Sequence, residues 1–191
     1  EKKIAEVMEY GKPDFEKWLR TESYKSHFKT KLPQAGLQAY YNFDNGTSNN
    51  TIKPNQQGAM KRELSSVAGD RPVFENREEG KSLVLNGDEW LDLTPVGIFG
   101  KSDPFSIGIR VWIPRELSEG VIFHKTIAER LFNYRGYHLY YKNDQLEMGI
   151  SHAAPSNALT KVSKQTIPKE EWIRLTMTYD GSATAGGMQL Y

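Results

Sequence analysis

The nearest approach to a catalytic arrangement in this sequence is an acidic stretch at residues 88–92. Asp88, Trp90 and Asp92 occupy positions i, i+2 and i+4, whereas Glu89 falls on the opposite face of a strand. Glycoside hydrolysis needs carboxyl groups that flank one bond, and this spacing would supply them if all three positions were acidic. The central position is a tryptophan. We therefore expect no enzyme activity, with a diverged glycoside hydrolase as the weaker alternative.

Two aspartates are the best-placed residues for a metal ion. Asp44 precedes Asn-Gly, and Asp180 lies in a Tyr-Asp-Gly turn, so both belong to loops that offer the oxygen ligands of calcium. Asx turns explain the same residues without a metal, and both interpretations stay open. Histidine does not support a metal site, because His124, His138 and His152 lie on separate segments without His-x-His or His-x₃-His spacing.

Aromatic side chains and two polar loops are the remaining candidates for binding. An aromatic ring can stack on the apolar face of a sugar while polar neighbours bind its hydroxyls. The segments before and after a predicted hairpin at residues 137–150 should meet at its open end. The candidate ligand site therefore comprises Arg135, Tyr137, His152 and Asn157, with Trp112 or Tyr140 as a stacking platform. The alternative is that the rings only cover a sheet and the polar groups only hold the loops together.

Alternating apolar residues predict the strands that must position these side chains. Phe105, Ile107 and Ile109 begin the longest alternation, which Pro104 opens and Pro114 closes. The predicted strands lie at residues 37–43, 81–86, 90–93, 105–113, 121–124, 137–142, 145–150, 161–164 and 172–179, with another from 188 onward. Residues 45–76 are expected to be a long loop region with one or two short strands, and residues 151–158 a shorter loop.

This succession of strands and turns predicts an all-β antiparallel sandwich. Ile107, Ile109, Val111, Leu175 and Met177 should be buried between its two sheets. Residues 1–33 differ, because their apolar residues recur with helical spacing on either side of a Gly-Lys-Pro break. We expect two short amphipathic helices there, which either pack on the sandwich or join it to an upstream domain.

Composition limits the classes of function. The 191 residues carry 25 basic and 24 acidic side chains, a formal charge of +1, and no cysteine. The balanced charge does not favour nucleic-acid binding, and the lack of cysteine excludes disulfides and thiolate metal sites. No apolar run is long enough for a membrane span. The apolar alternation at Met188 and Leu190 suggests a strand that continues past Tyr191, as in a fragment of a longer protein.

Several segments together resemble the laminin-G-like, concanavalin A-like lectin/glucanase jelly roll. The resemblance runs from residue 36 to residue 191 and rests on the order of GLQAYYNFD, GKSLVLNG, DPFSIGIRVWI, VIFHK and EEWIRLTMTYDGS. YRGYHLYY and SHAAPSNAL are similar to the version embedded in large bacterial proteins that carry planctomycete-type cytochrome c segments. The resemblance implies a jelly roll at residues 34–191 after a helical appendage at 1–33, a periplasmic or extracellular parent protein, and final strands beyond Tyr191.

These observations favour a non-catalytic recognition module. Its expected partner is a glycan or a neighbouring module of the parent protein, with a structural calcium ion as the one cofactor that the loops suggest. The alternatives are a structural spacer that binds nothing and the diverged hydrolase. An exposed cluster of aromatic side chains on the concave sheet face would favour binding, and a filled or loop-covered face would favour the spacer.

Overall fold

The computed structural model describes residues 12–14, 16–17, 20, 35–51, 57–62, 65–68, 71–78, 80–87, 89–93, 96–127 and 135–191. The chain divides into two compact units, Glu1–Gln38 and Ala39–Tyr191. In the first unit, the described residues 12–14, 16–17 and 20 are helical, within the second of the two predicted helices. The first predicted helix, near residues 4–8, lies outside the described residues. No described helix is long and apolar enough to cross a membrane.

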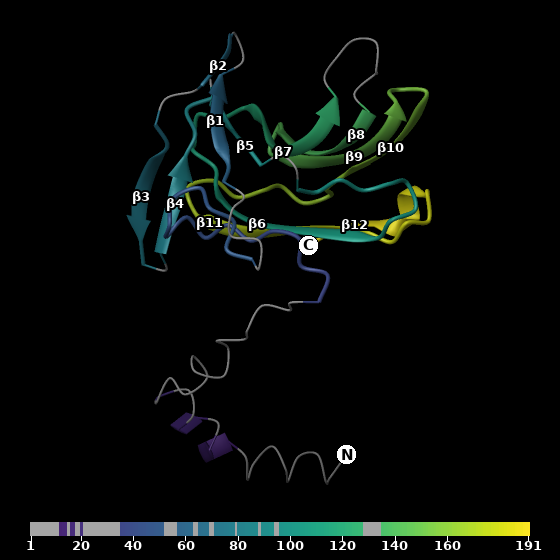
Figure 1. Ribbon diagram of the computed structural model, residues 1–191. Coiled ribbons are helices and arrows are strands. Elements are labelled where there is room, and N and C mark those ends of the chain that lie inside the picture. Colours follow the sequence, from purple (N-terminus) through teal and green to yellow (C-terminus); the bar gives the residue numbers. More distant parts are fainter. Residues whose placement is uncertain are drawn as a thin grey trace, which may run out of the picture. The chain divides into compact units, whose positions relative to one another are not determined.

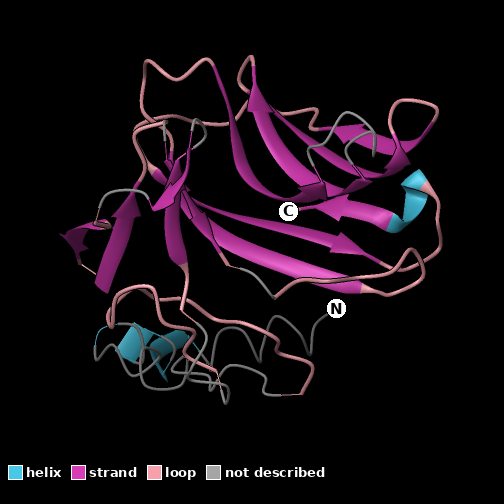
Figure 2. Ribbon diagram, turned by 45° about the horizontal axis from the view of Figure 1, so that its top comes forward, coloured by secondary structure: helices cyan, strands magenta, loops and turns pink. Residues whose placement is uncertain are grey.

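The second unit is an all-β antiparallel sandwich (Figure 1). One sheet has the order β10-β9-β8-β7, and the facing sheet has the order β12-β11-β6. The strands of the first sheet are β7 (Glu119–Ile127), β8 (Arg135–Lys142), β9 (Gln145–Ala153) and β10 (Asn157–Val162). Those of the second are β6 (Phe105–Trp112), β11 (Trp172–Tyr179) and β12 (Met188–Leu190), with the 3₁₀ turn η2 (Ala185–Gly187) before β12. Figure 2 shows the two layers from a second side.

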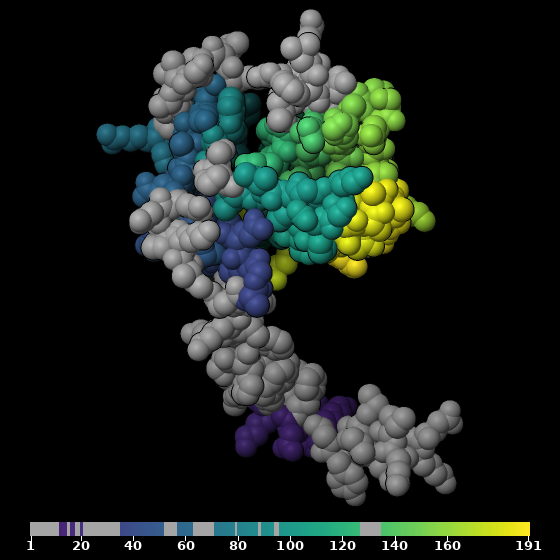
Figure 3. Space-filling view, turned by 45° about the vertical axis from the view of Figure 1, so that its right-hand side comes forward, coloured from purple at the N-terminus to yellow at the C-terminus, as the bar shows by residue number. Residues whose placement is uncertain are grey.

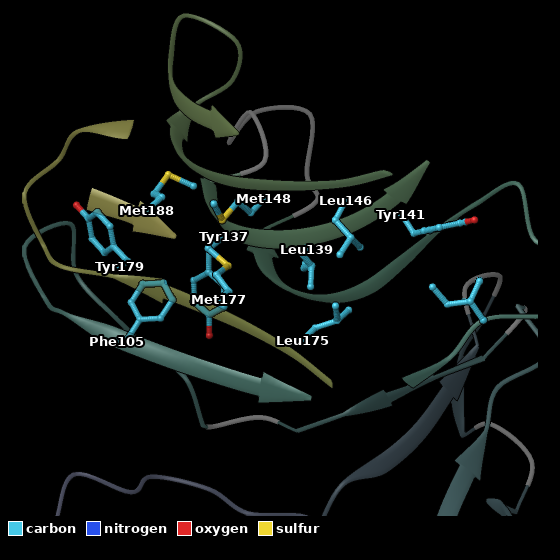
Figure 4. Packing of buried hydrophobic residues seen from close by; sticks show 11 residues of the cluster. Phe105, Tyr137, Leu139, Tyr141, Leu146, Met148, Leu175, Met177, Tyr179 and Met188 are labelled. Atoms are coloured by element: carbon cyan, nitrogen blue, oxygen red, sulfur yellow. The ribbon is translucent and has the colours of Figure 1, made fainter. Parts of the chain in front are cut away.

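The core lies between these two sheets (Figure 4). Alternate residues of each strand point inward, which is why Leu139 of β8, Met148 of β9 and Met177 of β11 are almost completely buried. Leu175 and Met177 are buried as predicted. Ile107, Ile109 and Val111 pack against the same cluster but are only partly buried, because β6 lies at the edge of its sheet.

The hairpin of β8 and β9 is the best-predicted element. Its two turn residues, Asn143 and Asp144, have φ angles of 50° and 59°, which the primed hairpin turns require. Lys142 pairs with Gln145, and the ladder continues to Gly136 and Ser151. β9 continues to Ala153 and β10 begins at Asn157, so the predicted loop at residues 151–158 is shorter than expected. A bulge between Asn157 and Ala158 accommodates the change of register.

Shorter strands flank the sandwich on the side of Trp112. β1 (Ala59–Arg62), β2 (Ser65–Ala68) and β5 (Glu89–Asp92) form a sheet of order β2-β1-β5. β3 (Val73–Arg77) and β4 (Gly80–Val84) form a hairpin. Three short strands therefore begin within residues 45–76, one or two more than predicted.

The strand predicted at residues 37–43 does not form, and that prediction is wrong. The backbone N–H of Tyr40 donates to Oδ1 of Asn49 (2.9 Å), and its carbonyl accepts from the N–H of Asn50 (2.6 Å). Phe43 has a φ of 63°, which ends the extended segment. A local side chain and a turn thus take the backbone groups that a neighbouring strand would need.

At the end of the sandwich opposite Trp112, segments that are distant in the sequence contact one another. In Figure 3 the yellow atoms of the C-terminal segment border the teal atoms of the segment that leads into β6. The hydroxyl of Tyr179 donates to the carbonyl of Lys101 (2.5 Å) and accepts from the N–H of Ala183 (2.8 Å). A side chain on Gly181 would clash with the carbonyl of Ser102, at 2.5 Å from a Cβ atom. Only glycine therefore fits this turn, whose φ is +82°.

Candidate functional site

The ligand residues predicted from the sequence are distributed over four places. Arg135, His152 and Asn157 lie at one end of the β10-β9-β8-β7 sheet, and all three are exposed. Gly136 pairs with Ser151, so the next residues along the two strands, Arg135 and His152, also come opposite each other. This end of the sheet therefore brings together three of the six predicted residues.

Tyr137 lies in the core. Its ring centroid is 4.9 Å from that of Phe105 and 5.8 Å from that of Phe99. Its hydroxyl donates to the carbonyl of Gly97 (2.7 Å). Burial raises the pKa of this phenol to about 12. With 7% of its surface exposed, Tyr137 cannot present its ring to a ligand and serves packing.

Tyr140 lies on the outer face of the same sheet, which is bowed so that this face is concave (Figure 1). Partial burial and, after it, a hydrogen bond to Glu119 raise the pKa of Tyr140. Glu119 also pairs with Lys142 (3.1 Å). His138 lies beside it and contacts Glu147 across the ladder (3.3 Å). The polar groups of this face therefore bind one another.

Trp112 lies on the other sheet, so the structure does not join it to Tyr140 or to the loop residues. Residues of β6 alternate between the core and the outer face, and Trp112 points outward with 45% of its surface exposed. Its cross-strand partner is Trp172 of β11, and their ring centroids are 6.1 Å apart at an edge-to-face angle of 62°. The indole of Trp172 supports the exposed indole of Trp112 from the side.

Arginines surround the two tryptophans. Arg110 of β6 and Arg174 of β11 are directly opposite each other in the next cross-strand pair on the same face of the sheet. The guanidinium carbon of Arg110 lies 5.5 Å from the ring centroid of Trp172, and that of Arg77 from β3 lies 5.4 Å from the same centroid. Both are within the range of a cation–π interaction. We call Arg77, Arg110, Trp112, Trp172 and Arg174 the basic aromatic patch.

The patch is positively charged and open to solvent. Arg77, Arg110 and Arg174 are exposed. Arg77 forms an ion pair with Glu75. Among the residues that the structure describes, no carboxylate lies within ion-pair distance of Arg174. The chain as a whole carries a formal charge of only +1, so this concentration of guanidinium groups is local.

Sequence reasoning identified Trp112 but missed Trp172, Arg174 and Arg77. A signal for two of them was present, since β6 contains Arg-x-Trp and β11 contains the reverse order, Trp-x-Arg. When two such strands pair antiparallel, tryptophan meets tryptophan and arginine meets arginine on one face. Arg77 comes directly after the region expected to be mainly loop, and no sequence pattern links it to β11.

The two predicted calcium ligands lie in separate turns. Asp44 accepts from the side-chain amide of Asn42 (2.7 Å), and Oδ1 of Asp180 accepts from the N–H of Ser182 (2.8 Å). Hydrogen bonds from the side chain and then from the backbone of Ser182 lower the pKa of Asp180. Both carboxylates thus make the local bonds of turns.

These aspartates also lie at opposite ends of the second sheet. Asp180 follows the last residue of β11, whereas Asp44 lies 3.0 Å from where a Cβ atom on Gly80 would be, beside the hairpin that holds Arg77 against Trp172. Within the described part of the chain, no three histidine, cysteine, aspartate or glutamate side chains are grouped for a metal ion.

The acidic stretch forms β5 next to the basic strand β1. Asp92 forms an ion pair with Lys61, and Glu89 pairs with Arg62 (3.1 Å). Asp88 lies outside the described residues. Trp90, between the two carboxylates, has 38% of its surface exposed. The described carboxylates of this strand therefore hold two strands together through basic partners.

Comparison with known proteins finds no matching family model, no matching curated protein and no matching solved structure.

Proposed function

We propose that this chain is a non-catalytic recognition module that binds a carbohydrate on the outer face of the β12-β11-β6 sheet, within a larger exported bacterial protein. The observation that carries the proposal is the indole of Trp112, 45% exposed on a sheet face and supported by Trp172. A large ring held in this way presents a flat apolar surface that matches the apolar face of a pyranose.

Polar residues further along the same face as Trp112 favour a sugar chain over a purely apolar ligand. Ser106 and Thr178 form an outward cross-strand pair on the same face, and Thr176 follows toward the tryptophans. Their hydroxyl groups can both donate and accept hydrogen bonds, as sugar hydroxyls require. The resemblance to the laminin-G-like jelly roll, with its lectin-like members, supports the same class of ligand.

The test is a binding survey with the whole chain. Affinity electrophoresis through gels that contain neutral or acidic polysaccharides identifies ligands, and titration calorimetry then measures their affinities. Trp112→Ala should weaken binding at least about tenfold, equivalent to about 1.4 kcal/mol. Trp90→Ala is the matched control, because Trp90 is similarly exposed, at 38%, but lies on β5. Its affinity should equal that of the wild type.

Two results would overturn the proposal. One is that no polysaccharide of the survey shows saturable binding, which is what a structural spacer or a module that only contacts its neighbours predicts. The other is binding that survives Trp112→Ala unchanged. Loss of binding in Arg135→Gln but not in Trp112→Ala would move the site to the open end of the β8–β9 hairpin.

A further inference from the structure

We propose that the ligand of the basic aromatic patch is an anionic polysaccharide, which carries carboxylate or sulfate groups on its sugar rings. This inference rests on the proposed function, because it specifies which kind of carbohydrate stacks on Trp112. Its basis is the pairing of Arg110 with Arg174 beside two tryptophans that also pair with each other.

The arginine pair is unfavourable for the sheet by itself. Side chains directly opposite each other in an antiparallel ladder have Cβ atoms about 4.5–5.5 Å apart, and like charges there destabilise the pairing. Arg77 adds a third guanidinium from a separate hairpin, directed at the same ring of Trp172. Folding thus places three guanidinium groups on one face. Glu75 pairs with that of Arg77, whereas no described carboxylate pairs with Arg174.

An anion bound at this face would supply a counter-charge to Arg174, which has no carboxylate partner among the described residues. A guanidinium group presents parallel N–H donors that match the two oxygens of a carboxylate or a sulfate. The contacts with the ring of Trp172 keep the Arg110 and Arg77 guanidinium groups close to the tryptophan pair. Trp112 lies two residues further along β6 on the same face, so one sugar ring can cover the indole while the charged group of that ring or its neighbour reaches an arginine.

The surroundings favour a polysaccharide over an acidic peptide or a nucleic acid. Beyond the arginines, the outward residues Ser106, Thr176, Thr178 and Gln189 continue the face over three strands with neutral hydrogen-bonding groups. A nucleic acid requires a wide basic field, whereas the whole chain has a formal charge of +1. The face thus has a few positive charges at one end and neutral hydroxyl and amide groups along the rest. This distribution matches a polysaccharide whose hydroxyl groups outnumber its charged groups.

The experiment compares polymers that differ only in charge. Polygalacturonate is tested against the same polymer with its carboxyl groups methyl-esterified, and dextran sulfate against dextran, by calorimetry on the whole chain. The charged member of at least one pair should bind at least about tenfold more tightly than its neutral counterpart. The preferred pair tells whether the group is a carboxylate or a sulfate. Raising the salt from about 50 mM to about 500 mM should weaken this binding.

Variants separate a binding role of the arginines from a structural one. Arg174→Gln should weaken binding of the charged polymer about tenfold and leave the melting temperature unchanged or higher, because it relieves the repulsion with Arg110. Arg135→Gln is the control, since Arg135 is exposed on the other sheet. A lowered melting temperature of Arg174→Gln with unchanged binding would mean that Arg174 acts only in the fold, and would overturn the inference.

The remaining outcomes distinguish this inference from the proposed function. Equal binding of the charged and neutral members, lost in Trp112→Ala, would overturn the anionic ligand while leaving carbohydrate recognition intact. No binding of any polysaccharide would overturn both. Tighter binding of poly-glutamate or of a single-stranded oligonucleotide than of any polysaccharide would assign the patch to a different class of partner and also overturn the inference.

Discussion

At the scale of single residues, the difference in burial between Tyr137 and Trp112 gives these two aromatic side chains different roles. Tyr137 is enclosed by Phe99 and Phe105 and bonded to Gly97, whereas Trp112 keeps 45% of its surface exposed. Tyr137 therefore contributes to the stability of the sandwich, and Trp112 is available to a ligand.

The burial of Tyr137 predicts a pH dependence of stability. Its pKa is raised from 10.0 to about 12 in the folded chain, so the folded state holds the phenolic proton more strongly than the unfolded state. The resulting stabilisation is complete below pH 10 and is lost as the pH rises through about 12. Urea denaturation at about pH 8 and about pH 11 should show a larger loss of stability for the wild type than for Tyr137→Phe.

Tyr137→Phe also removes the hydrogen bond to Gly97. At neutral pH the variant should lose about 0.5–1.5 kcal/mol of unfolding free energy. Equal losses between the two pH values in wild type and variant would show that Tyr137 ionises as freely in the folded chain as in the unfolded one, contrary to its enclosed position.

At the scale of elements, the pairing of β7, β8 and β9 depends on backbone that approaches closely at glycine. Gly136 has a φ of +136°, and a Cβ atom there would overlap the carbonyl of Lys125 on β7. Gly149 leaves room for the ring of His138, which a Cβ atom would meet. The two glycines therefore allow the strands of the β10-β9-β8-β7 sheet to pair where they approach this closely.

Gly136→Ala should therefore be strongly destabilising. Both the positive φ and the overlap with backbone oppose a side chain there, so we expect a loss of more than about 2 kcal/mol of unfolding free energy. Gly108→Ala on β6 is the matched control, since its nearest neighbour is Oγ1 of Thr176 at 3.9 Å from the Cβ position. Equal denaturation midpoints of the two variants would contradict the close approach of β7 and β8.

The core of the sandwich should show a graded response to truncation. Leu139 is fully buried, so Leu139→Ala should cost about 2–5 kcal/mol, whereas Ile109→Ala should cost less because Ile109 is only partly buried. Chemical denaturation gives both values. A larger loss for Ile109→Ala would place β6 deeper in the core than its edge position implies.

Local patterns predicted the long strands well, and their limits are physical. Alternation identified β6, β8, β9 and β11, because each buries one face. The same alternation at residues 37–43 failed, since the backbone groups of Tyr40 are bonded to Asn49 and Asn50 rather than to a strand. Pairing between distant strands leaves little local trace. For this reason, the sequence offers either Trp112 or Tyr140 as the stacking platform of one site, although the two residues lie on different sheets.

At the scale of the whole molecule, every residue of the core cluster lies within Ala39–Tyr191. Residues 39–191 expressed alone should therefore unfold cooperatively, at a midpoint within about 0.3 M urea of the full chain for a typical slope of denaturation. A fragment that is unfolded, or that melts in several steps, would show that Glu1–Gln38 contributes to the fold.

The most direct test of the central claim is to observe the tryptophans while the ligand binds. The chain has four tryptophans, whose indole N–H signals in a nitrogen–proton spectrum can be assigned by substitution. Addition of galacturonate oligomers or sulfated dextran oligomers should shift the signals of Trp112 and Trp172 in a saturable manner and leave that of Trp90 in place. Saturable shifts at the amides of Gly136 and His152, with both patch indoles unmoved, would contradict the account and place recognition on the other sheet.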